Sequence, residues 1–375
     1  MQKYLSIILL FCLYQPHILS MFPKGSQLEF GPARQAYYQG NQDVFGPKDQ
    51  NQQSAAPDKP CPFCDTAIMA TNYVLSEDTT RDVRIMMNKF PYPDFDQAVH
   101  CLCMPTSHKT HPDDFYPQEL AHQADTIQQL SVYLHDRAHT QEHFTNWGRM
   151  AGQSVPHWHS QFKSFEKPPL SMPERMRWYE YRTISNSADA FKALQTRLEQ
   201  QKNTPPSPCN VAYNNIHCLC CAVQKEYEYD NDNFVVARFD HNFMCLSHYP
   251  EIAGEISIIP NEHVSSLKDM QKEVWQENMV ISTALLPIMK AYANTHIREC
   301  GGANTYTKSI GAQAEPRLQQ QYHIHTRIMP RTTIAFTPGD IDSNSRKLDY
   351  NPTHLLAYLV PHIQTINEKL MLVNK

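Results

Sequence analysis

The chain lacks the charge pattern of a polyanion-binding protein. Its 375 residues include 33 basic and 38 acidic side chains, for a formal net charge of −5, and they contain no long basic run. The overall charge of the protein therefore does not favour binding to nucleic acid, and we expect no nucleic-acid partner. Any phosphate group that this protein recognises must be held by local chemistry.

A membrane-spanning segment is also missing. The apolar run within residues 1–20 is too short to cross a bilayer, so we expect no stable membrane insertion. The segment resembles a secretory signal peptide, but it has no small-residue cleavage site and Met21 follows it directly. We expect a cytoplasmic protein, and the signal-like segment leaves export open.

The cysteines do not make a complete disulfide framework, because their number, 11, is odd. Two pairs instead have the spacing of metal ligands: Cys61 and Cys64 in CPFC, and Cys218 and Cys221 in CLCC. The chain also has 19 histidines. Such a composition indicates zinc thiolate chemistry before disulfides, and it favours a reducing compartment.

The same order of signals occurs twice along the chain. Each copy has a C-x-x-C pair, two strand-like stretches, a Pro three residues before a His, a long helical pattern and a final H-x-H. The copies share similar spacing, which indicates an internal repeat. Strands followed by one long helix predict an α+β fold of two tandem units, each a mainly antiparallel sheet with a packed helix.

The repeat sets the predicted boundaries. They are an N-terminal signal-like segment and arm (1–57), a first unit that carries the chemistry (58–185), a polar, Pro-containing linker (186–210) and a second unit (211–375).

The stretch GQSVPHWHSQF, residues 152–162, places His157, His159 and Gln161 on alternate positions. On a strand these three side chains would share one face, and Trp158 would point into the core. A pair of structural histidines is the alternative for one H-x-H alone, and the repeat favours a functional pair.

Cys61, Cys64, His108 and His157 make a Cys₂His₂ set, the composition of a closed structural zinc site. A buried thiol pair or a redox motif is the alternative for CPFC. The second copy offers Cys218, Cys221, His263 and His323 for a second zinc ion, unless this copy has become scaffold. Cys220 could replace either neighbouring cysteine.

With His157 assigned to the metal, His159 stays free to act as a nucleophile toward a phosphoryl or nucleotidyl group. Gly152 allows a close backbone approach, and Ser154 offers a hydroxyl to phosphate oxygens. The Gln161 amide can donate to the same oxygens as charge develops. This set predicts nucleotidyl or phosphoryl transfer through a covalent histidine intermediate.

These residues resemble the histidine-triad superfamily and, within it, the galactose-1-phosphate uridylyltransferase branch. That branch has the motif G-x-S-x-P-H-P-H-x-Q, which the chain matches except at Trp158. The resemblance covers about residues 58–335, including NKFP and CMPTSHKT. It implies a HIT-like fold, a role in galactose metabolism, nucleotide-sugar and sugar-phosphate substrates, zinc and a homodimer.

Roles for individual residues also follow from the resemblance. His159 would be uridylylated by a UDP-sugar, and Gln161 and Ser154 would hold the phosphate. Asn88 and Phe90 would lie near the nucleotide, and Asn146 near the phosphate. Cys61, Cys64, His108 and His157 would bind zinc.

The second copy departs from this pattern. Arg327 stands where Gln161 stands in the first, so we interpret this copy as non-nucleophilic. The family's second metal site uses a further histidine shortly upstream, and residues 300–321 contain none. Two other functions stay open: a dinucleoside polyphosphate phosphorylase or hydrolase of the same superfamily, and a zinc-stabilised nucleotide-binding protein without turnover.

Overall fold

A computed structural model describes residues 61–65, 69, 74–88, 98–166, 235–246, 254–297, 300–314, 316, 319, 322–331 and 352–373. The predicted arm, the predicted linker, Phe90, Cys218 and Cys221 lie outside these ranges. The helices and strands within them are β1 (Val74–Asp78), β2 (Val83–Met87), β3 (Ala98–Met104), η2 (Pro112–Asp114), α4 (Pro117–His135), β4 (Thr140–Trp147), η3 (Arg149–Ala151), β5 (Ser160–Phe165), β6 (Val235–Arg238), β7 (Asn242–Leu246), β8 (Ile256–Pro260), α8 (Lys272–His296), β9 (Gly302–Ile310), β10 (Thr326–Arg331) and α10 (Pro352–Met371).

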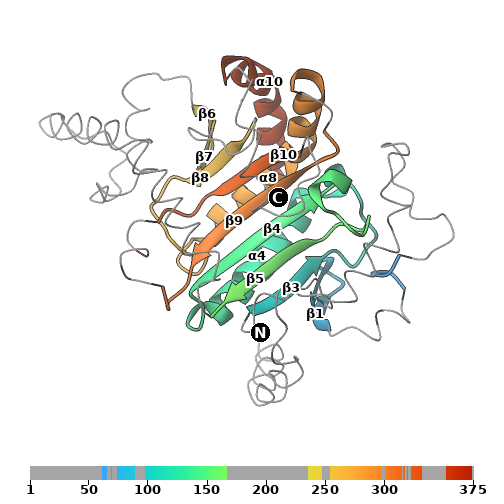
Figure 1. Ribbon diagram of the computed structural model, residues 1–375, viewed down its shortest axis with the longest axis vertical. Helices are drawn as coiled ribbons and strands as arrows, with labels where there is room; N and C mark the ends of the chain where they lie inside the picture. The colour runs from blue at the N-terminus through green and yellow to red at the C-terminus, as the bar shows by residue number, and fades with distance from the viewer. Residues whose placement is uncertain are drawn as a thin grey trace, which may run out of the picture.

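Two five-stranded halves make a single antiparallel sheet. Its order is β1-β2-β3-β5-β4-β9-β10-β8-β7-β6, so the second half repeats the first in reverse (Figure 1). Every pairing in the sheet is antiparallel. The predicted α+β fold of two tandem antiparallel units is confirmed, and the edge-to-edge fusion of the two units was not predicted.

The halves meet where β4 pairs with β9 along eight residue pairs, from Thr140–Ile310 to Trp147–Ala303. Two glycines allow the close approach at one end of this seam. A Cβ on Gly302 would lie 2.2 Å from the Trp147 carbonyl oxygen, and one on Gly148 would lie 2.3 Å from the Gly301 oxygen. Gly148 also has φ +89°, a conformation that side chains with a Cβ rarely adopt.

The long helices α4 and α8 cover one face of the sheet, and α10 packs beside α8 (Figure 1). Strand alternation sends Phe162 of β5 into the core under these helices, with Ile127 and Trp275. Gln161 and Lys163 consequently point to the opposite face, which we call the open face. None of the helices that the structure describes is long and apolar enough to cross a bilayer.

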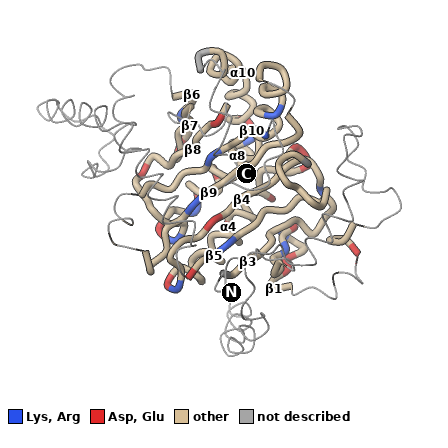
Figure 2. Tube along the Cα trace, in the orientation of Figure 1, with Lys and Arg blue, Asp and Glu red and all other residues tan. Residues whose placement is uncertain are grey.

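Charge on the open face is mixed rather than of one sign. Lys163 of β5 stands opposite Glu142 of β4, which in turn stands opposite Lys308 of β9. Figure 2 shows basic and acidic positions interspersed over the described strands. This arrangement agrees with the near balance of charges along the chain.

One local expectation was wrong. The stretch HWH is not part of a strand, because β5 begins at Ser160. Residues 157–159 instead lie along the segment that follows β3, where the Trp158 N–H donates to the Lys109 carbonyl at 2.6 Å. Pro156, which has no N–H for a ladder, precedes them. Trp158 does point into the core, as predicted, and is 2% exposed against Phe115.

Candidate active site and metal centre

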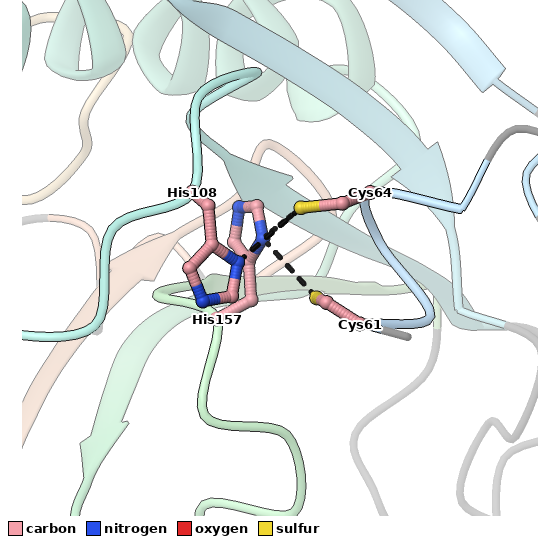
Figure 3. A group of neighbouring side chains, drawn as sticks. All are labelled: Cys61, Cys64, His108 and His157. Atoms are coloured by element: carbon pink, nitrogen blue, oxygen red, sulfur yellow. Dashed lines mark hydrogen bonds between the residues drawn. The ribbon is translucent and has the colours of Figure 1, made fainter. Parts of the chain in front are cut away.

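Four side chains from three loops converge beside the start of β5. Cys61 and Cys64 lie on one loop, His108 follows β3 and His157 precedes β5 (Figure 3). Their donor atoms all lie within 4.8 Å of one another. These are the four residues of the predicted Cys₂His₂ set.

Distances among the donor atoms fit a tetrahedral zinc ion. The Cys64 sulfur lies 3.3 Å from Nδ1 of both histidines, and the Cys61 sulfur lies 3.5 Å from Nδ1 of His157. A tetrahedron with Zn–S of about 2.3 Å and Zn–N of about 2.0 Å would have S···N edges of roughly 3.5 Å. These four residues could therefore hold zinc without rearrangement of the loops.

Hydrogen bonding fixes the tautomer of His157. Its Nε2 lies 3.1 Å from the Pro105 carbonyl oxygen, which can only accept, so Nε2 carries the proton. The Nδ1 lone pair then points to the two cysteines. Burial lowers the pKa of this imidazole to about 4, which keeps it neutral, as a metal ligand must be.

The Cys64 thiol is protonated when no cation is present. Burial, together with the neighbouring Cys61, raises the pKa of Cys64 to about 11. A divalent cation would have to displace the Cys64 proton, which would couple metal binding to pH.

Asp82 holds the loop that carries His108. Its carboxylate accepts hydrogen bonds from the Thr106 hydroxyl and the Ser107 N–H, both at 2.7 Å. Burial opposes ionisation of this carboxyl, but the hydrogen bonds from Ser107 and Thr106 outweigh it and lower the pKa to about 2. Asp82 thus joins this loop to the turn before β2.

His159 has the opposite tautomer to His157. Its Nδ1 lies 2.9 Å from the His157 carbonyl oxygen, so Nδ1 donates and Nε2 keeps its lone pair. Burial lowers the pKa of His159, and the ring is 5% exposed. A neutral, oriented imidazole with an unprotonated Nε2 is the form that a nucleophile requires.

Phe63 connects the loop of Cys61 and Cys64, which we call the cysteine loop, to His157 and His159. Its ring makes edge contacts with His157 at 5.7 Å and with His159 at 5.5 Å between centroids. Sequence reasoning missed this residue, although its place between Cys61 and Cys64 puts it beside whatever those cysteines bind. The cysteine loop therefore packs directly on the predicted nucleophile.

The predicted phosphate contacts fall into two groups. Asn146, at the end of β4, accepts from Asn304 at 2.6 Å through Oδ1. Its Nδ2 consequently faces the other way, 3.7 Å from the place of a Cβ on Gly152. Gly152 has φ +87°, and Ser154 is exposed two residues later in the same loop.

Gln161 and Asn88 form the second group, and His100 connects them. The His100 ring lies 2.9 Å from Gln161 Oε1 and within hydrogen-bond reach of Asn88 Nδ2. Sequence reasoning missed His100. Its signal was the alternation in HCLCM, which places His100 on the face that Gln161 shares.

The second half repeats part of this geometry. His263 and His323 make an edge contact at 4.9 Å, as His108 and His157 do at 5.1 Å. His325 Nδ1 lies 2.9 Å from the His323 carbonyl oxygen, which matches His159. The predicted partners Cys218 and Cys221 lie outside the described residues.

Arg327, the counterpart of Gln161 in the second half, is already paired with a carboxylate. It makes a two-bond ion pair with Glu255, at 2.7 and 2.6 Å, and both side chains are buried. A carboxylate thus occupies the guanidinium fork that could otherwise bind an anion.

Comparison of the sequence found no matching family model, and no curated protein matches it. Solved structures do match its fold. A structure described as uridylyltransferase aligns over 84% of this chain and 93% of its own, with 15% identity and a TM-score of 0.56.

Two Arabidopsis thaliana proteins align comparably. An ADP-glucose phosphorylase with bound ADP-glucose covers 81% of this chain and 90% of its own, at 16% identity and a TM-score of 0.55. A protein described as galt-like covers 80% of this chain and 92% of its own, at 16% identity and a TM-score of 0.55. The chain therefore has the fold of the uridylyltransferases, the branch that its histidine motif resembles.

Proposed function

We propose that the protein is a nucleotidyltransferase that moves a UMP group between a UDP-sugar and a sugar 1-phosphate through a nucleotidyl-His159 intermediate. The observation that carries this proposal is the pair of opposed tautomers. His157 directs Nδ1 to the cysteines, while its carbonyl oxygen holds Nδ1 of His159 and leaves Nε2 to react.

The transfer has two balanced steps. The Nε2 lone pair of His159 attacks the α-phosphorus, a P–N bond forms, and the bond to the bridging oxygen breaks with release of sugar 1-phosphate. A second sugar 1-phosphate then attacks the same phosphorus through a phosphate oxygen, the P–N bond breaks and the lone pair returns to Nε2. Each step reuses the same site, which predicts ping-pong kinetics.

Donors for the phosphate oxygens would come from both groups of residues. The Gln161 amide and the Ser154 hydroxyl would face the charge that develops in the transition state. Asn146 Nδ2 and the glycine backbone at Gly152 would hold the phosphate, and Asn88 and Phe90 would contact the nucleotide.

Cys61, Cys64, His108 and His157 would hold zinc. Zinc bound there would hold the three loops together. A second zinc ion would use His263 and His323 with Cys218 and Cys221. Assembly as a homodimer and a role in galactose metabolism are expectations from the motif resemblance.

Phosphorolysis is the second candidate, because one matching fold belongs to an ADP-glucose phosphorylase. In that reaction inorganic phosphate, instead of a sugar phosphate, would take the nucleotidyl group from His159. Gln161 suits either acceptor, but an amide cannot protonate a leaving group, which disfavours a hydrolase.

The test is the mass of the intact protein after incubation with UDP-glucose and no acceptor, under mildly alkaline conditions that preserve a P–N bond. We expect a uridylyl increment in the wild type and none in His159→Asn. If galactose 1-phosphate removes the uridylyl increment from the wild type and inorganic phosphate does not, the result would support the uridylyltransferase. Loss with phosphate would support the phosphorylase, as would an adenylyl increment from ADP-glucose. Nucleotide binding without any increment would leave a binding protein.

A further inference from the structure

His100 is a buried titratable residue that the proposed reaction does not use. It lies on β3, is 3% exposed and points to the open face. Its neighbour in register on β5 is Lys163, two residues beyond Gln161. A buried imidazole on this face needs polar partners, because an unpaired polar group in a core is costly.

The partners fix which nitrogen carries the proton. His100 Nε2 lies 2.9 Å from Gln161 Oε1, an oxygen that can only accept, so Nε2 donates. Asn88 Nδ2 lies 3.3 Å from Nδ1 and 3.1 Å from Nε2 of His100. Because Nε2 carries the proton, only the Nδ1 lone pair can accept from Asn88. The Asn88 N–H also donates to the His100 carbonyl at 2.8 Å, which holds the two residues together.

This chain of bonds leaves one orientation for the Gln161 amide. Because Oε1 is bound to His100, the NH₂ end is the end that can turn to a ligand. An amide flipped by 180° would offer an oxygen to the phosphate instead, and like partial charges would repel. Gln161 is the second residue of β5 and follows His159 by two positions in the chain.

We propose that His100 is a positioning residue for the transfer. It donates to Gln161 Oε1 and thereby turns the amide donors of Gln161 toward the phosphoryl oxygens. This inference rests on the proposed function of His159. It also places Asn88 in the same bonded chain, so the nucleotide side and the phosphate side of the site are mechanically connected through His100.

The test compares His100→Leu, which cannot donate, with His100→Gln, which can donate through its own amide. His143→Leu is the matched control, because it removes a buried histidine from β4, which is separated from β3 by β5, and its side chain faces the helices rather than the open face. The measurement is the single-turnover rate of nucleotidylation at increasing UDP-glucose, with urea unfolding as a check on stability.

We expect His100→Leu to slow the saturated rate by about 10- to 100-fold, the range for loss of a group that orients a reacting residue, with KM little changed. His100→Gln should recover much of this loss, and His143→Leu should keep the wild-type rate. In a Gln161→Ala background, His100→Leu should have no further effect, since its role acts through that amide.

Two results would overturn the role of His100 alone: labelling of His100→Leu at the wild-type rate, or the same slowing in the presence and absence of Gln161. A wild type that forms no adduct would contradict the proposed function and this role together. The wild-type arm therefore separates the two failures.

Discussion

At the residue scale, the site depends on backbone carbonyls that fix imidazole tautomers. The Pro105 carbonyl directs Nδ1 of His157 to the cysteines, and the His157 carbonyl binds Nδ1 of His159 and leaves its Nε2 unprotonated. The motif predicted that the two histidines have different tasks. The motif could not predict the contact of His100 with Gln161, because that contact depends on the register between β3 and β5, which a single sequence does not reveal.

Another buried histidine predicts an acid sensitivity. Burial lowers the pKa of His143 to about 3, and its Nε2 has no hydrogen-bond partner among the described residues. In the unfolded chain this imidazole takes up a proton near pH 6.5, so stability is present above that pH and is lost as pH falls from about 6.5 toward 3. The slope is about 1.4 kcal/mol per pH unit for one proton.

Urea unfolding of the wild type and of His143→Leu at several pH values between 7 and 4 measures this effect. We expect the variant to lose less stability than the wild type as pH falls. The difference in the free energy of unfolding should grow by up to about 1.4 kcal/mol per pH unit below pH 6.5. Parallel pH profiles would contradict a neutral, buried His143.

The buried pair of Arg327 and Glu255 makes a second residue-scale prediction. Removal of one partner leaves a buried charge, so Arg327→Met should lower the free energy of unfolding by about 3–5 kcal/mol. The double variant with Glu255→Gln should recover much of this loss and should still form the His159 adduct. Loss of the adduct in a stable double variant would contradict the assignment of chemistry to the first half alone.

At the element scale, the cysteine loop would couple zinc binding to His159 in the proposed mechanism. Phe63 packs on both His157 and His159, so a loop released from the metal would uncover the His159 ring. Removal of zinc by a chelator should therefore lower Tm and slow nucleotidylation by about tenfold or more. Metal analysis, thermal unfolding and the labelling rate measure the three effects on one sample.

Cys61→Ser/Cys64→Ser is the matched control for chelation. This variant should already show the slow rate and should not respond to chelator, while zinc should restore the treated wild type. A metal-free protein with unchanged Tm and full labelling would contradict the coupling.

The elements themselves were partly predictable. The strand-like stretches and the long helical pattern expected in the first copy correspond to strands such as β3 and to α4. The strand expected at HWH failed because residues 157–159 follow the loop after β3 instead of a ladder. The Trp158 N–H donates to the Lys109 carbonyl, a contact between segments distant in sequence that strand periodicity does not indicate.

At the scale of the whole molecule, fusion of the halves into one sheet predicts cooperative unfolding. A methyl group on Gly302 would collide with the Trp147 carbonyl, which belongs to the other half. Gly302→Ala should therefore lower the free energy of unfolding by about 1–3 kcal/mol, and both halves should still unfold in one transition. Urea unfolding followed by fluorescence and by circular dichroism tests for one shared midpoint.

Gly301→Ala is the control, because its Cβ would meet the side chain of Met150, which can move more readily than backbone. It should cost less than Gly302→Ala. Two separate transitions in either variant would contradict a seam that joins the halves into one folding unit.

The repeat in the sequence predicted two units, but it did not predict that β4 and β9 are neighbours. Both strands are central, and the pairing of Thr140–Trp147 with Gly302–Ile310 joins segments far apart in the chain. Periodicity within each unit is a local signal, while the order of strands across the seam is set by long-range packing.

The measurement that tests the central claim most directly is the location of the adduct. The protein is incubated with UDP-glucose, digested at alkaline pH, and its peptides are fragmented by a method that keeps the P–N bond. We predict a uridylyl group on His159, bonded through Nε2, with His157 and His325 unmodified. An adduct on another residue, or on Nδ1 of His159, would contradict the account.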